Sequence, residues 1–183
     1  MTIVTGMSGS GKTTFCRNHY SMKDWVGLDH WNETLHSYFR NPNPHGCEDE
    51  LADCRWSLRF VREGGEYVER AKKTNNTVLE FLEWAETLSD HDSLIVDGIW
   101  IFMDSVNFKE KHKWYIFPKV SLPFYLYRRK MQSWWGKWNH DIMGTLWLLK
   151  DIDFELGFFL RQKRHFVPFL KKIRESNEDI TWI

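Results

Sequence analysis

A glycine-rich stretch near the amino end of the chain constrains the fold more than any other feature of the sequence. It fits the pattern G-x-x-x-x-G-K-[ST] through four residues: Gly6, Gly11, Lys12 and Thr13. This pattern is typical of loops that bind nucleotide phosphates. The apolar run at residues 3–4 predicts a strand before the loop, and residues 12–20 are predicted to form a helix after it. Strand, loop and helix in this order are the frame that such a loop requires.

The residue types in this stretch suit the binding of a triphosphate. Glycine lets the backbone fold into a nest of N–H groups, and the positive end of the helix dipole points to the same place. We predict that Lys12 reaches the β- and γ-phosphates and that the Thr13 hydroxyl binds Mg²⁺. The predicted nucleotide-binding residues are Gly9, Ser10, Gly11, Lys12, Thr13 and Thr14. The competing interpretation is a glycine-rich turn that only precedes a helix.

Length and composition indicate one globular domain that spans residues 1–183. Hydrophobic residues make up 42% of the chain, which is enough for a core. The formal net charge is zero, so contact with nucleic acid would need a local basic patch. The three cysteines form no C-x-x-C pair and are expected to be small core residues in a reducing compartment. Without a recognisable signal peptide or an apolar run of about 20 residues, a soluble cytoplasmic protein with no membrane segment is expected.

A second strand is predicted at residues 24–29, and it ends in the carboxylate of Asp29. Ligands of an open parallel sheet bind outside the carboxyl ends of its strands, where the phosphate loop also lies. We therefore predict that Asp29 is the catalytic base that deprotonates an acceptor hydroxyl. The alternative is that Asp29 caps the helix predicted at residues 31–40.

A third strand is predicted from the apolar run at residues 93–97, which ends in Asp97. A continuous apolar run is typical of a buried parallel strand, so Asp97 is delivered to the same edge as the phosphate loop. Together with Thr13, Asp97 is the predicted Mg²⁺ site. The alternative is that Asp97 caps the turn that follows.

Helical periodicity predicts helices at residues 47–62, 66–73 and 77–88, within an insertion over about residues 41–90 that we expect to bind the acceptor. The first of these helices carries a row of basic residues: Arg55, Arg59 and Arg62. The row could contact acceptor phosphate. A solvated face is favoured, in which these arginines pair with Glu48, Asp49 or Glu63.

A lid region is predicted over about residues 122–153. A fourth strand at residues 114–120 precedes a helix over about residues 122–135, on which Arg128 or Arg129 is expected to close over the triphosphate. The alternative is plain helix surface, and Arg161 and Arg164 are weaker candidates for phosphate contact. The chain is then predicted to be helical to about residue 176, with a kink at Pro168, and to end in a strand at residues 180–183.

Three of the eleven tryptophans lie together after the lid arginines: Trp134, Trp135 and Trp138. Packing within the domain is the favoured interpretation, because large aromatic side chains are usually buried. The alternative is a platform on which the bases of a single-stranded nucleic acid stack.

Taken together, these residues resemble the P-loop kinases, the group of nucleoside, nucleotide and polynucleotide kinases, along nearly the whole chain. The resemblance implies an α/β fold with a parallel sheet of about five strands, flanking helices and an arginine-bearing helical lid. The segment Asp29-His30-Trp31 looks like that of the polynucleotide-kinase and zeta-toxin branch, in which the aspartate activates the acceptor hydroxyl. One departure concerns the acceptor: that branch usually has an arginine just after this segment, where this chain has Asn32.

The resemblance implies an ATP- and Mg²⁺-dependent kinase that phosphorylates a hydroxyl group. Its implied catalytic residues are Asp29, Lys12, Arg128 and Arg129. The expected acceptor is a nucleoside, a nucleotide or a nucleic acid, and the compact, basic and aromatic lid also resembles phage kinases of hydroxymethylpyrimidines in DNA. A small metabolite such as a sugar acid is the alternative acceptor. A nucleotide-dependent switch is a further alternative, although the guanine-reading NKxD motif that such a switch would carry is absent from the sequence.

Overall fold

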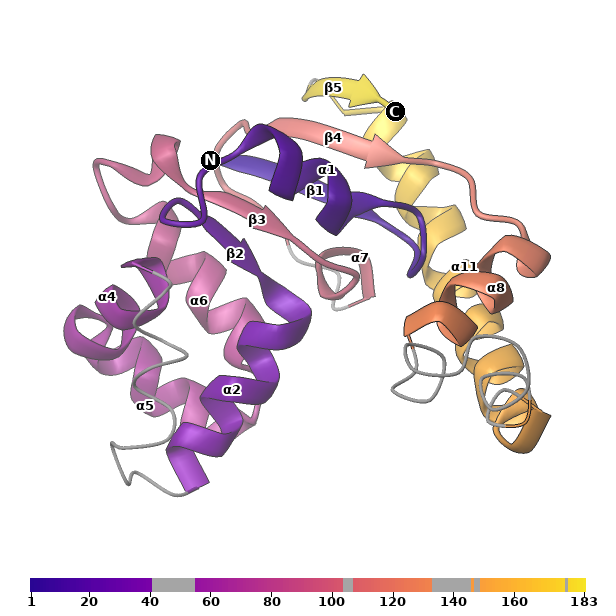
Figure 1. The fold of residues 1–183 in the computed structure, drawn as a ribbon. Coiled ribbons are helices and arrows are strands. Elements are labelled where there is room, and N and C mark those ends of the chain that lie inside the picture. Colours follow the sequence, from indigo (N-terminus) through magenta and orange to yellow (C-terminus); the bar gives the residue numbers. More distant parts are fainter. Residues whose placement is uncertain (41–54, 104–106, 133–145, 147–148, 177) are drawn as a thin grey trace.

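Five parallel strands form the centre of the protein. The computed structural model describes residues 1–40, 55–103, 107–132, 146, 149–176 and 178–183. The strand order is β2-β3-β1-β4-β5 (Figure 1). The strands are β1 (Thr2–Gly6), β2 (Trp25–Gly27), β3 (Ile95–Asp97), β4 (Lys113–Phe117) and β5 (Asp179–Trp182). The described residues form one α/β domain around this sheet, which confirms the predicted α/β class with a parallel sheet and flanking helices.

The strand positions follow the prediction, but several strands are shorter. The strand predicted at residues 24–29 ends at Gly27, because helix α2 begins at Leu28. We had predicted that Asp29 ends a strand. This was wrong, because Asp29 lies in the first turn of α2. The strand predicted at residues 114–120 ends before Pro118, which has no N–H group to donate to a ladder.

The helices occupy the connections between the strands. They are α1 (Lys12–His19), α2 (Leu28–Arg40), α4 (Arg55–Glu63), α5 (Gly65–Thr74), α6 (Thr77–Glu86), α7 (Trp100–Met103), α8 (Leu122–Gln132) and α11 (Ile152–Arg174), with a 3₁₀ turn η1 (His91–Ser93). The predicted insertion is confirmed as helical over the part that the structure describes. Pro168 lies inside α11, which continues to Arg174. Trp134, Trp135 and Trp138 lie outside the described residues.

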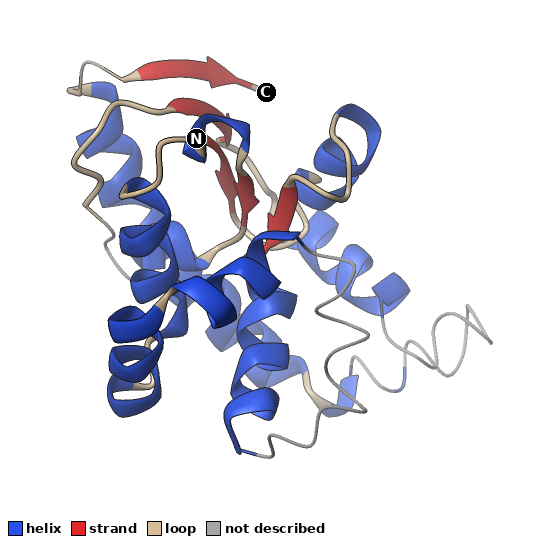
Figure 2. Ribbon diagram, turned by 90° about the vertical axis from the view of Figure 1, so that its left-hand side faces the viewer, coloured by secondary structure: helices blue, strands red, loops and turns tan. Residues whose placement is uncertain are grey.

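The handedness of the crossovers distributes the helices between the two faces of the sheet. The β1-to-β2 connection runs across the sheet in one direction, and the later connections run in the other. Because parallel crossovers are right-handed, α1 covers one face and the remaining helices cover the opposite face. Figure 2, with helices in blue and strands in red, shows most of the helices below the strands.

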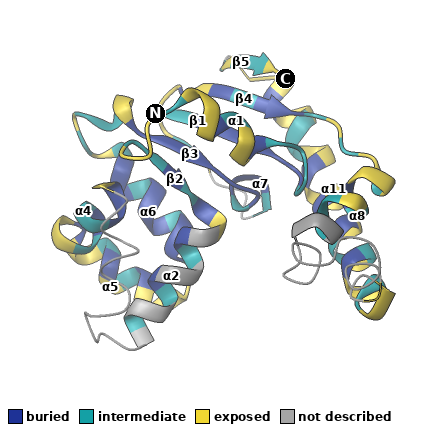
Figure 3. Ribbon diagram, in the orientation of Figure 1, coloured by how far each residue is buried: buried dark blue, intermediate teal, exposed yellow. Residues whose placement is uncertain are grey.

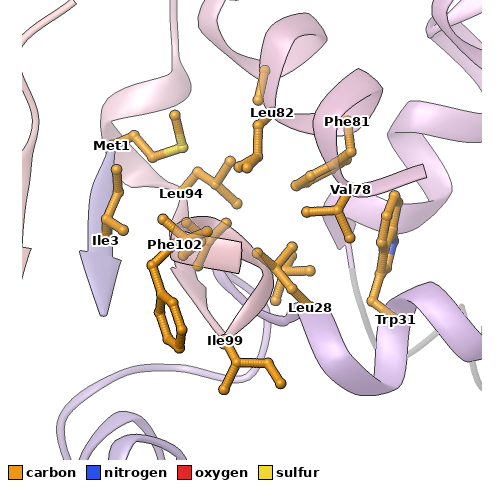
Figure 4. Close-up of a cluster of buried hydrophobic side chains, with 14 of the residues drawn as sticks. Met1, Ile3, Leu28, Trp31, Val78, Phe81, Leu82, Leu94, Ile99 and Phe102 are labelled. Carbon is orange, nitrogen blue, oxygen red and sulfur yellow. The ribbon is translucent and has the colours of Figure 1, made fainter. Parts of the chain in front are cut away.

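The two faces bury different clusters. Ile3 contributes to the large core on the side of α2, α6 and α11, whereas its neighbour Val4 packs with Cys16 of α1 on the other side. Figure 3 colours the buried residues dark blue along the ribbon, and Figure 4 shows side chains of this large core, in which Ile3 and Leu28 are fully buried. Full burial of one such aliphatic side chain contributes roughly 1.5–3 kcal/mol. Cys16 is a buried core residue, as we had predicted.

Candidate active site

The glycine-rich stretch forms the loop between β1 and α1. Gly11 has a φ of +104° and is the N-cap of α1, a backbone conformation that side chains with a Cβ rarely adopt. A Cβ at Gly6 would lie 2.8 Å from the carbonyl oxygen of Phe117 on β4. The glycines are therefore required both by the turn itself and by the close approach of the neighbouring strand.

Lys12 is the first residue of α1, directly after this loop, and its side chain is almost completely buried. Its Nζ donates a hydrogen bond of 3.1 Å to the carbonyl oxygen of Met7, at the opposite side of the loop. Burial lowers the pKa of Lys12, and the carboxylates of Asp29 and Asp97 act in the opposite direction. The Lys12 ammonium therefore lies within the electrostatic influence of both carboxylates.

Asp97 ends β3 and brings its carboxylate to the first turn of α1. Its Oδ2 accepts a hydrogen bond of 3.1 Å from the Thr13 hydroxyl, and its Oδ1 accepts one of 2.9 Å from the indole N–H of Trp25. Burial raises the pKa of the Asp97 carboxyl, while these hydrogen bonds and Lys12 oppose the rise. A Cβ at Gly27 would lie 3.2 Å from Oδ1, so any side chain at position 27 of β2 would crowd the Asp97 carboxylate.

Sequence reasoning missed Trp25. Its position depends on strand pairing, because β2 pairs with β3 so that Gly27 lies opposite Asp97. No spacing within the sequence indicates that an indole two residues before Gly27 contacts this carboxylate.

Asp29 also reaches this edge, although from the first turn of α2. The backbone N–H of Ile99 donates to Asp29 Oδ1 at 3.4 Å, and a Cβ at Gly98 would lie 3.2 Å from the same oxygen. The structure therefore brings Asp29 beside the end of β3 and within the electrostatic influence of Lys12. Because α2 begins at Leu28, Asp29 is not the N-cap of this helix.

The two candidate lid arginines have different environments. Arg128 packs against the loop: a Cβ at Gly9 would lie 3.5 Å from Arg128 Cβ, and the buried Arg128 Nε has no hydrogen-bond partner among the described residues. Arg129 instead binds Glu155 of α11 through Nε and a terminal nitrogen, both at 2.9 Å. The hydroxyl of Tyr125 donates to the same carboxylate.

Gln162 of α11 is the second residue that sequence reasoning missed. Its side chain is fully buried, and its Oε1 accepts a hydrogen bond of 2.6 Å from the backbone N–H of Ser8. Its Nε2 has no partner among the described residues, and neither has the buried hydroxyl of Ser10. Together with Arg128 Nε, these unpartnered polar atoms border the loop, as expected where a polar ligand completes the hydrogen bonds.

Comparison with known proteins gave no match. No family model, curated protein or solved structure matches this chain. The function therefore has to be argued from the residues of the site.

The donor set fits a nucleotide triphosphate with Mg²⁺. Mg²⁺ keeps several waters and is usually held by one or two carboxylates together with substrate phosphates. The Thr13 hydroxyl and the Asp97 carboxylate would hold it in this way beside the loop. Within the described ranges, no three His, Cys, Asp or Glu side chains form a metal-binding group, and a nucleotide-borne ion needs none.

Other predicted contacts lie away from this edge. Arg59 binds Glu63 at 2.8 Å and Asp90 at 2.7 Å, and Arg55 binds Asp90 at 3.2 Å. The interpretation of this row as a paired, solvated face is therefore confirmed for Arg59 with Glu63, whereas Glu48 and Asp49 lie outside the described residues.

Contacts with the described residues do not place three further positions at the loop. The side-chain oxygen of Asn32 accepts a hydrogen bond from the Thr77 hydroxyl, which ties α2 to α6. Arg161 is exposed on α11, and Arg164 lines a cavity further along that helix.

Across the part of the chain that the structure describes, no helix has the length and apolar character needed to span a membrane.

Proposed function

We propose that this protein is an ATP- and Mg²⁺-dependent kinase of the P-loop type, which transfers the γ-phosphate to an acceptor hydroxyl. One observation carries the proposal: a glycine-lined loop, its buried lysine and two carboxylates are brought by their hydrogen bonds to one edge of a parallel sheet. Lys12 and Asp29 lie in the first turns of the helices that follow β1 and β2, and Asp97 ends β3. A glycine-rich turn without function would not require a buried ammonium group within the electrostatic influence of Asp29 and Asp97.

Each group has a proposed role in the transfer. The loop N–H groups and Lys12 bind the phosphates, while Thr13 and Asp97 hold Mg²⁺, which when bound neutralises charge on the phosphate oxygens. Asp29 accepts the proton of the acceptor hydroxyl while the hydroxyl oxygen forms a bond to the γ-phosphorus. The bond from that phosphorus to the β–γ bridging oxygen breaks, and ADP leaves. Arg128 stabilises the charge that develops on the transferred group.

The proposed acceptor is a nucleoside, a nucleotide or a nucleic acid, including a hydroxymethylpyrimidine in DNA. Arg128 supports an acceptor site beside α8, because its guanidinium lies 5.7 Å from the exposed ring of Phe124. A cation and an aromatic face together suit a substrate that carries both phosphate and base. A small-metabolite kinase and a nucleotide-dependent switch are the alternatives.

The proposal is tested by ADP release from Mg-ATP with a panel of acceptors, while transfer of labelled γ-phosphate is followed in parallel. The panel contains free nucleosides, nucleotides, a 5′-hydroxyl oligonucleotide and hydroxymethylpyrimidine DNA, with Lys12→Ala as the inactive control. Acceptor-stimulated ADP release with label on the acceptor supports a kinase. ADP release that no acceptor changes, with no labelled product, would favour the switch.

A further inference from the structure

A cavity of about 460 Å³ lies on the helix-rich face of the sheet, away from the phosphate loop. It is open to solvent on one side and is lined by residues of α7, of the second half of α11 and by Trp114 of β4. Its volume is within the roughly 300–1,000 Å³ that is usual for small-molecule sites. The residues that carry the argument are Phe102, Trp114, Arg164, Pro168, Phe169 and Lys172.

One wall of the cavity is aromatic. The ring of Phe169 lies 6.1 Å from that of Phe102 and 5.9 Å from that of Trp114, measured between centroids. The ring of Phe108 lies 5.5 Å from that of Trp114 and extends the same wall. Phe102 and Trp114 are almost completely buried, so the partly exposed rings of Phe108 and Phe169 are the ones that a ligand would contact. They favour a ligand that contains a flat ring, since offset or edge-to-face contacts add to the burial of apolar area.

Helix α11 also supplies basic residues to the lining of the cavity. Arg164, His165 and Lys172 line it from exposed positions on α11. The lining contains one acidic residue, Glu178, whose Oε2 already accepts hydrogen bonds from the backbone N–H of His112 and the indole N–H of Trp114. The charge of the cavity therefore complements an anionic group.

Pro168 adds a hydrogen-bond acceptor to the wall. Because proline has no N–H group, the carbonyl oxygen of Arg164 lacks its usual donor four residues later in the helix. Arg164 and Pro168 both line the cavity. A carbonyl oxygen freed in this way can accept a hydrogen bond from an amino or hydroxyl group of a ligand.

We propose that this cavity is a second ligand site, which binds a nucleoside monophosphate. The base would lie against the aromatic wall, and the phosphate would bind Arg164 and Lys172. The two helices that line the cavity also reach the candidate active site. Helix α11 carries Gln162, which binds the loop at Ser8, and α7 follows Ile99, whose backbone N–H donates to Asp29. A ligand bound in the cavity would thus contact both α11 and α7, the two helices that help to position the loop and Asp29.

The test is calorimetric titration of the full chain with AMP. We expect saturable binding of one AMP with a Kd below about 1 mM, in wild type and equally in Lys12→Ala. The double variant Arg164→Glu/Lys172→Glu should weaken binding by at least about tenfold, because two charge-assisted contacts are lost. The matched control is Lys163→Glu/Lys171→Glu, which makes the same charge change on exposed positions of the same helix outside the cavity.

Three outcomes would overturn this assignment. One is the absence of saturable AMP binding, and another is an equal loss of binding in both double variants. The third is loss of binding in Lys12→Ala, which would place AMP on the phosphate loop. Thermal unfolding is measured for each variant as the control for correct folding. Because the titration does not depend on phosphate transfer, a failed kinase assay would leave this proposal standing.

Discussion

Thr13 and Asp97 are 84 positions apart in the chain, yet the Thr13 hydroxyl donates a hydrogen bond of 3.1 Å to the Asp97 carboxylate. This contact joins the first turn of α1 to the end of β3. It exists because β1 and β3 pair directly and in parallel, with Val4 opposite Asp97. The pairing places the hydroxyl and carboxylate that are proposed to hold Mg²⁺ on the same edge as the phosphate loop.

Asp29→Asn should remove phosphate transfer while leaving nucleotide binding intact. The amide cannot accept a proton, so kcat should fall by about 10²–10⁴. Steady-state kinetics and ATP titration measure the two effects separately. Asp92→Asn is the control, because Asp92 is exposed on η1 at the opposite end of the sheet. Unchanged turnover in Asp29→Asn would rule out this residue as the base.

Trp25→Phe should raise the Mg²⁺ concentration needed for activity. The substitution keeps an aromatic ring but removes the N–H that orients Asp97, and loss of such an outer contact costs about 10–100-fold in metal affinity. Activity measured against Mg²⁺ concentration tests this. Trp182→Phe, at an exposed tryptophan on β5, should leave the curve unchanged. The same curve in both variants would argue against a role for the indole.

Arg128→Ala and Arg129→Ala should separate catalysis from stability. Loss of Arg128 should reduce kcat by about 10²–10³ with little change in stability, because its Nε has no partner among the described residues. Loss of Arg129 leaves the buried Glu155 without its cation and should cost about 3 kcal/mol of unfolding free energy. Urea unfolding and kinetics of both variants distinguish these outcomes, and the reverse pattern would exchange the two roles.

Two substitutions at Gln162 should tell whether its amide nitrogen contacts the nucleotide. Gln162→Leu leaves the Ser8 N–H unpaired and should raise the KM for ATP by about tenfold. Gln162→Glu keeps an acceptor for Ser8 but places a negative charge where Nε2 was. If Nε2 donates to phosphate, the Glu variant should be at least as impaired as the Leu variant. Near wild-type kinetics in Gln162→Glu would restrict Gln162 to holding the loop.

Asp97→Asn should stabilise the nucleotide-free protein while abolishing its activity. Burial raises the pKa of this carboxyl in the folded state. Between its unfolded and folded pKa the native state binds more protons, so stability falls as pH rises through that window and stays lower above it. The melting temperature of the Asn variant should therefore exceed that of wild type at pH 7, with the difference vanishing at low pH. A lower melting temperature in Asp97→Asn at neutral pH would contradict this cause.

Local spacing was enough to predict the loop, the parallel α/β fold and the convergence of Lys12, Thr13 and Asp97. A glycine pattern between a strand and a helix sets its own backbone geometry, and apolar runs that end in aspartate deliver carboxylates to one edge. The element that carries Asp29 was predicted wrongly, because the sequence pattern placed the helix at residues 31–40, whereas α2 begins three residues earlier, at Leu28.

The contacts of Trp25 and Gln162 and the separation of Arg128 from Arg129 came from packing over long distances in the chain. Successive residues of a helix point about 100° apart, so the rotation of α8 determines which arginine faces the loop. That rotation is set by burial of Tyr125 against α11, and Gln162 reaches Ser8 across 154 positions. Such contacts depend on strand register and helix docking, which leave no local pattern in the sequence.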